Sequence, residues 1–146
     1  SPDGRLIAVG RMDGQLGLAS VDTGNWVLEP RKVYAGPVDG VEFSPDGSLL
    51  VTSGNDGRIR LWDGRSGASR GSVRAVPAGV RSFVTFREDG RALMVAGSDG
   101  SVRRWDLRIE TWARLACARA GRDLTTEEWV DIFGEDQPYR RTCPTT

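Results

Sequence analysis

The sequence predicts an all-β protein that is built from repeated four-stranded antiparallel units and followed by a helical segment. A turn motif at residues 1–4, Ser-Pro-Asp-Gly, recurs at 44–47 and in altered form at 87–90, so its aspartate returns every 43 residues. A second turn, Asp-Gly, begins at residues 13, 56 and 99, and Trp-Asp occupies 62–63 and 105–106, in the same register. Both turn types favour tight reversals between strands, so these landmarks predict a tandem array of β-hairpins.

The segments between the turns have the length and composition of strands. In the middle repeat they lie at residues 41–43, 49–52, 59–62 and 72–76, and in the last repeat at 83–86, 93–96 and 102–105. A single four-stranded sheet of this kind leaves two apolar faces and two open edges. Stacking such sheets around an axis covers the faces, so the sequence predicts β-propeller blades over residues 1–106.

A period of 43 residues with four strands and Trp-Asp resembles the WD40 family, although Ala19-Ser20 replaces Trp-Asp in the first repeat. The resemblance implies a partial propeller of about two and a half blades. Since closed propellers have roughly 4 to 8 blades, we expect a C-terminal fragment whose remaining blades belong to the same parent chain. The resemblance assigns structural turn and blade roles to Asp13, Asp46, Asp56, Asp89, Asp99, Trp62, Asp63, Trp105 and Asp106.

The sequence departs from this family at one conspicuous position. WD40 repeats usually carry Gly-His ahead of the Ser-Pro-Asp-Gly turn, and the imidazole bridges the turn aspartate to a Ser or Thr and to the Trp. This chain contains no histidine, and the matching pairs are Val33-Tyr34 and Val76-Pro77. We therefore expect Asp56 and Asp99 to act as plain turn residues that cap nearby backbone N–H groups.

Residues 107–146 lack the strand pattern and predict a two-helix hairpin followed by an extended strap. Apolar side chains from residue 109 onward recur at helical spacing, and Gly121 stands where a C-terminal cap is expected. Thr125 and Glu128 have the spacing of a capping box, and Leu124 and Trp129 that of a hydrophobic staple. These signals predict a second helix at about residues 126–133.

Two stretches of this tail, LACARAGRDLTTEEW (115–129) and PYRRTC (138–143), resemble the C-terminal end of bacterial STAND-type (NACHT/NB-ARC-like) signalling ATPases that carry WD40 repeats. The resemblance implies a parent protein with an effector domain, a P-loop nucleotide switch and a WD40 sensor. Cys117 and Cys143 both lie in these stretches. Either they form a disulfide that anchors the strap, or they remain two thiols in a reducing cytosol, one of them buried.

Composition excludes several classes of function. The chain has 20 basic and 20 acidic residues, and the tail carries a slight excess of acids, which argues against a nucleic-acid partner. No apolar run is long enough to cross a membrane, and without histidine neither a Ser-His-Asp triad nor a histidine metal site can form. We expect no catalytic, cofactor or metal site, no membrane partner, and a cytoplasmic location.

The sequence therefore predicts a non-catalytic protein–protein interaction module that holds a protein or peptide partner on the propeller rim. Four arginines flank the Trp-Asp strands, namely Arg58, Arg60, Arg103 and Arg104. They either belong to a docking face or are solvated residues whose stems cover apolar surface. The rival functions are a stand-alone WD40 scaffold and, less favoured, a DNA-binding regulator that acts through the C-terminal helices.

Overall fold

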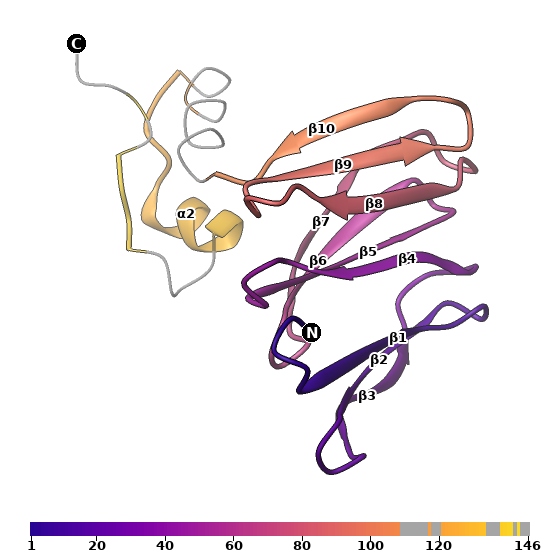
Figure 1. The fold of residues 1–146 in the computed structure, drawn as a ribbon. Coiled ribbons are helices and arrows are strands. Elements are labelled where there is room, and N and C mark those ends of the chain that lie inside the picture. Colours follow the sequence, from indigo (N-terminus) through magenta and orange to yellow (C-terminus); the bar gives the residue numbers. More distant parts are fainter. Residues whose placement is uncertain (109–116, 118–120, 134–137, 142, 144–146) are drawn as a thin grey trace. The chain divides into compact units, whose positions relative to one another are not determined.

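The computed structural model describes residues 1–108, 117, 121–133, 138–141 and 143. The chain divides into two compact units, Ser1–Trp105 and Asp106–Thr146, which are described separately below. The first unit is all-β, with three antiparallel sheets that follow one another along the chain (Figure 1).

The strands of the three sheets are arranged in chain order. The first sheet contains β1 (Leu6–Gly10), β2 (Gln15–Ser20) and β3 (Trp26–Lys32), and the second contains β4 (Val38–Phe43), β5 (Leu49–Gly54), β6 (Arg58–Asp63) and β7 (Ser69–Arg74). The third contains β8 (Ser82–Phe86), β9 (Ala92–Gly97) and β10 (Val102–Asp106). The predicted blade architecture is thus present as one four-stranded and two three-stranded sheets.

Neighbouring sheets pack through their inner strands and buried faces. Strand β4 lies between β1 and β8 (Figure 1). A core of Leu16, Leu50 and Trp62 joins the first two sheets, because each residue belongs to an inward face of its strand. The second and third sheets are joined by hydrogen bonds, in which Ser53 Oγ donates to the carbonyl of Ser82 at 2.6 Å and Ser82 Oγ donates to the carbonyl of Gly54 at 3.2 Å.

The loops at one end of the sheets are cross-linked by backbone hydrogen bonds. These loops, 11–14, 33–37, 55–57, 75–81 and 98–101, define what we call the network end. The Gly57 carbonyl accepts bonds from Ala75 N and Val76 N at 2.8 and 3.1 Å, which ties a hairpin turn to the loop leaving the same sheet. Gly57 has φ +73°, and a Cβ there would collide with the Val76 carbonyl oxygen, so glycine is required.

The C-terminal unit contains one described helix, α2 (Thr126–Phe133), which matches the second helix expected from the capping box. Glu128 N donates to Thr125 Oγ1 at 3.2 Å, and Thr125 N donates to Glu128 Oε2 at 2.8 Å, so the reciprocal box is formed. The first expected helix falls largely outside the described residues. The predicted helical hairpin is therefore not supported: the described part of the tail shows a single short helix.

The C-terminal unit is held together around one buried tryptophan. Trp129 is 1% exposed and meets the ring of Tyr139 edge-on at 5.7 Å, while Tyr139 Oη donates to the carbonyl of Leu124 at 2.9 Å. Cys117 and Cys143 form a disulfide with their Cα atoms 5.2 Å apart. The sequence left open whether these cysteines pair, and in the structure they do. The disulfide connects Cys117, which precedes α2, to Cys143, which follows it.

Candidate functional site

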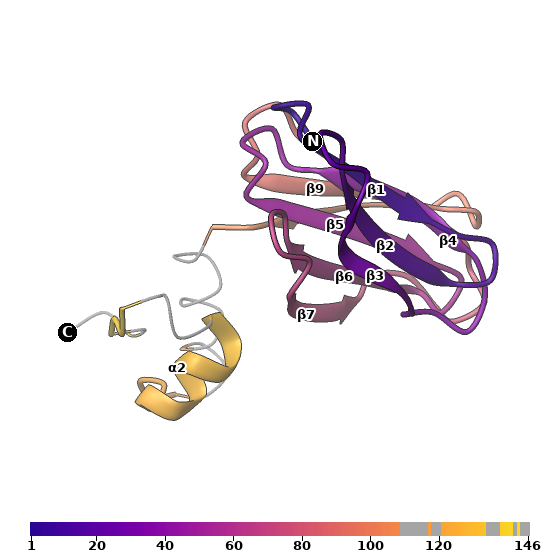
Figure 2. The same cartoon turned by 90° about the horizontal axis from the view of Figure 1, so that it is seen from below.

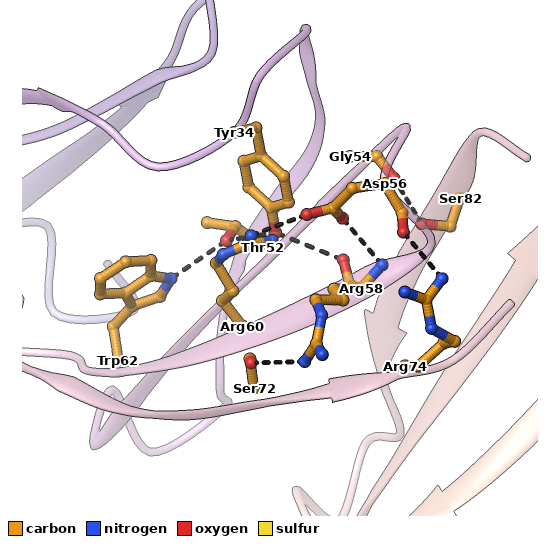
Figure 3. A network of polar contacts seen from close by, with 10 residues as sticks. All are labelled: Tyr34, Thr52, Gly54, Asp56, Arg58, Arg60, Trp62, Ser72, Arg74 and Ser82. Carbon is orange, nitrogen blue, oxygen red and sulfur yellow. Dashed lines mark hydrogen bonds and ion pairs between the residues drawn. The ribbon is translucent and has the colours of Figure 1, made fainter. Parts of the chain in front are cut away.

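A buried polar network occupies the centre of the second sheet near the network end (Figure 3). The indole Nε1 of Trp62 on β6 donates to Thr52 Oγ1 on β5 at 3.0 Å. The hydroxyl of Tyr34, from the loop after β3, lies 3.0 Å from the same oxygen. Tyr34 is 2% exposed and Thr52 is fully buried, so these bonds lie away from water. Tyr34 thus bonds Thr52, the acceptor of the Trp62 indole, from the position that matches the histidine of WD40 repeats.

An arginine extends this network to the turn aspartate. The Arg60 guanidinium lies over the Tyr34 ring, with its carbon 3.9 Å from the ring centroid. Arg60 Nη2 also donates to Asp56 Oδ2 at 2.7 Å in a partly buried ion pair (Figure 3). The network therefore connects Trp62, Thr52, Tyr34, Arg60 and Asp56, although Asp56 does not touch the tyrosine hydroxyl.

The protonation states of the network follow from this geometry. Burial raises the pKa of the Tyr34 hydroxyl above its ordinary value, and its contacts with Thr52 and Arg60 offset only part of that rise. Burial alone would raise the pKa of Asp56 and lower that of Arg60. Burial is the largest single cause for each group, but the ion pair, together with the Arg58 N–H bond to Asp56 and the contact of Arg60 with Tyr34, outweighs it. The pKa of Asp56 is therefore lowered and that of Arg60 is raised. All three groups keep one charge state near neutral pH.

The turn aspartates accept hydrogen bonds from backbone N–H groups two residues ahead. Asp56 Oδ1 accepts from Arg58 N at 2.8 Å, and Asp99 Oδ1 accepts from Ser101 N at 3.0 Å. The same contact occurs at Asp13, Asp46, Asp89, Asp63 and Asp106. Asp63 also accepts a bond from Ser66 N, three residues ahead, at 2.9 Å, and this bond is the main cause that holds the pKa of Asp63 well below its usual range. These residues therefore fix the turns of the blades.

The buried network belongs to the second sheet alone among the three. In the third sheet the positions of Tyr34 and Thr52 are taken by Pro77 and Val95, neither of which has a side-chain hydroxyl. Trp105, which corresponds to Trp62 in the third sheet, is half-buried. Sequence reasoning missed the network, because it considered only the lost histidine. The signal that could have found it is the coincidence of Tyr34, Thr52 and Trp62 in one repeat.

The structure does not bring the four candidate arginines into one cluster. Arg60 is engaged by Tyr34 and Asp56, and Arg58 Nη1 donates to Ser72 Oγ at 3.0 Å. Arg103 and Arg104 lie on β10 of the third sheet and are exposed. Arg60 thus has an internal structural role that neither of the two readings of the sequence anticipated.

An open pocket of about 430 Å³ lies between the first two sheets, beside the network. Strands β3, β6 and β7, which come together in Figure 2, supply its walls. Its lining includes Arg31, Lys32, Arg60, Trp62, Ser69 and Ser72, and we call it the basic pocket. The sequence did not single out Arg31 and Lys32, because the residues opposite them are about 30 to 40 positions away and become neighbours only when the sheets stack.

The described part of the chain contains neither a metal site nor a membrane-spanning helix. No group of three or more His, Cys, Asp or Glu side chains there is placed to hold a metal ion. No described helix is long and apolar enough to cross a bilayer.

Comparison with known proteins agrees with this architecture. The chain is similar to Sqt1 from Chaetomium thermophilum bound to the N-terminus of the ribosomal protein L10, with 31% identity over 74% of this chain and a TM-score of 0.65. A second structure of the same Sqt1 gives 30% identity over 73% of this chain and a TM-score of 0.64. The chain spans only about three-tenths of those Sqt1 chains, 30% and 29% respectively. No curated protein matches it.

The family model described as WD domain, G-beta repeat matches residues 28–63 and 70–106, which together make up half of the chain. Both matched stretches end at a Trp-Asp pair, and together they contain strands β4–β6 and β8–β10 with most of β3 and β7. The chain belongs to the WD40 repeat family.

Proposed function

We propose that the chain is a non-catalytic protein-interaction module that binds a protein or peptide partner through the loops of the network end. The observation that carries the proposal is its likeness to Sqt1, a WD40 protein whose structure is known with the N-terminus of a ribosomal protein bound. Nothing in the described residues resembles a catalytic centre. The fold of this chain is similar to that of this peptide-bound protein, with a TM-score of 0.65.

The architecture supports rigid presentation of these loops. Val38 N, at the start of β4, donates to the carbonyl of Arg11 in the turn of the first sheet at 3.1 Å. Gly79 N, in the connection from β7 to β8, donates to the carbonyl of Asn55 at 3.0 Å, so the loops at this end are bonded to neighbouring segments. The buried network anchors one of these loops through Tyr34. Loops that are fixed before binding lose little conformational entropy when a partner docks, which favours affinity.

An exposed methionine gives the proposal a direct test. Met12, in the turn between β1 and β2, is 78% exposed at the network end. Val21, in the turn between β2 and β3, is 48% exposed at the opposite end of the same sheet and serves as the matched control. We expect Met12→Glu in the intact protein to deplete a stoichiometric partner that co-purifies with the wild type, and Val21→Glu to retain it. Equal retention by both variants would place the docking surface elsewhere.

We further propose that this module is the C-terminal WD40 sensor of a bacterial STAND-type ATPase. The support is the resemblance of residues 115–129 and 138–143 to the end of such proteins. Reading the coding sequence upstream of Ser1 tests it. Further 43-residue repeats preceded by a Gly-x-x-x-x-Gly-Lys-Ser/Thr loop would support an ATPase parent. Repeats that run back to an initiator methionine would instead favour the stand-alone scaffold.

A further inference from the structure

We propose that the basic pocket binds an anionic side chain, a carboxylate or a phosphate group, that the protein partner presents. The proposal rests on the proposed function and adds the chemistry of the partner. The pocket measures about 430 Å³ and is open to solvent, which is large enough for one side chain and its flanking backbone. Its lining contains two arginines, one lysine and no acidic residue.

Two of the three positive charges in the pocket are uncompensated. The charge of Arg60 is balanced by its ion pair with Asp56. Arg31 and Lys32, adjacent at the end of β3, form no ion pair with an acidic side chain in the part of the chain that the structure describes. Uncompensated positive charge beside a concave site attracts an anion and strengthens hydrogen bonds to it, since a bond that involves an ionised group is about twice as strong as a neutral one.

The wall opposite these charges supplies an aromatic face and hydroxyl groups. The Arg31 guanidinium lies 5.5 Å from the ring centroid of Trp62, which holds the cation over the pocket floor. Ser72 Oγ accepts a hydrogen bond from Arg58 Nη1 at 3.0 Å, so its own proton is available to donate. An arginine fork, an ammonium group and a serine hydroxyl are donors that suit the oxygens of a carboxylate or phosphate.

The backbone around the pocket favours a side chain over an added β-strand as the occupant. Strand β7 is bulged where Leu61 pairs with Gly71 and Trp62 with Ser69, and β3 is also irregular against β2. Pro30 within β3 removes a backbone donor. Bulges and proline discourage further strand pairing at a sheet edge. A Cβ atom added at Gly71 would meet no atom within 4 Å, so the space beside this part of the wall is open.

Peptide titration of the intact protein tests the proposal. The probes are fluorescent heptapeptides that carry glutamates, one phosphoserine, or glutamines at the same positions, together with a single-stranded oligonucleotide. The test variant is the pair Arg31→Gln and Lys32→Gln. The control is Arg91→Gln, which removes an exposed arginine in the turn between β8 and β9 of the third sheet. The glutamate and phosphoserine arms distinguish the two sources of the anion.

We expect an acidic or phosphorylated peptide to bind and the glutamine peptide not to bind. The double variant should weaken that binding at least tenfold, and the Arg91 control should change it less than twofold. Binding that is equal in the wild type and the double variant would overturn the proposal. Binding of the oligonucleotide, with no binding of either anionic peptide, would also overturn the proposal, since it would indicate a nucleic-acid partner.

Co-purification separates this proposal from the function on which it rests. If the double variant retains the natural partner as fully as the wild type, the pocket is not its binding site, while the interaction function stands. If no partner co-purifies with the wild type, the interaction function fails, and the peptide titration still decides whether the pocket binds anions.

Discussion

Replacing Thr52 by valine tests the buried network most directly. The change keeps the shape of a fully buried side chain but removes the oxygen that accepts the indole N–H of Trp62 and bonds the hydroxyl of Tyr34, both at 3.0 Å. A buried donor without an acceptor costs about 1–3 kcal/mol. The Tyr34 hydroxyl keeps a longer contact of 3.5 Å with the Arg58 carbonyl, so its loss is smaller. We expect Thr52→Val to lower the free energy of unfolding by about 2–3 kcal/mol.

Thr52→Ser is the matched control, because it keeps the hydroxyl and removes one buried methyl group at a cost of about 1 kcal/mol. Urea unfolding of the intact protein, followed by tryptophan fluorescence, compares the variants. Tyr34→Phe should destabilise the wild type more than it destabilises the Thr52→Val protein, because the hydrogen-bond partner is already absent in the latter. A valine variant as stable as the serine variant would refute the assignment of these bonds.

Three further predictions follow from the turns and the C-terminal unit. Gly57→Ala should lower the free energy of unfolding by about 3 kcal/mol or more, and Gly100→Ala by only about 1–2 kcal/mol. Both glycines have positive φ, but only a Cβ at position 57 would collide with a carbonyl oxygen. Equal losses in urea unfolding would contradict this prediction. Reducing the disulfide, which closes a loop of 26 residues, should destabilise the C-terminal unit by about 3.5 kcal/mol and expose it to thermolysin, and unchanged cleavage would be the contrary result. Hydrogen bonding to Arg122 lowers the pKa of Glu128 to about 2. The ionised carboxylate therefore stabilises α2 fully above about pH 4.5, and this stabilisation is lost as the pH falls toward 2. Glu128→Gln should abolish this part of the acid transition, which circular dichroism measures.

The sequence was informative wherever structure is determined locally. The 43-residue period located the turns and three strands in each of the last two sheets, because Asp-Gly and Pro-Asp-Gly fix the backbone without help from distant residues. The fourth strand was predicted at 72–76, whereas β7 spans Ser69–Arg74. The bulge at Gly71 explains this difference, because it interrupts the alternation from which strands are recognised.

Features that depend on contact between sheets or between distant strands escaped prediction. Tyr34 reaches Thr52 across 18 residues, and Arg60 reaches the Tyr34 ring from a separate strand. The basic pocket combines Arg31 with Ser72 from another sheet. Such neighbours are created by packing, so a single sequence without an assembled fold does not indicate them. The first helix of the predicted C-terminal hairpin, inferred from helical spacing and a cap at Gly121, falls largely outside the described residues, so only the second helix is described.

The tyrosine in the second blade also changes how that blade responds to acidity. A histidine in its place would carry a group whose ordinary pKa is about 6.5, so a modest fall in pH could charge the core of the blade. Here the tyrosine pKa is raised, the aspartate pKa is lowered and the arginine remains charged. The interior of the blade consequently keeps the same charges from mildly acidic to alkaline conditions. A protein built on this blade can present its loops in the same geometry throughout that range of pH.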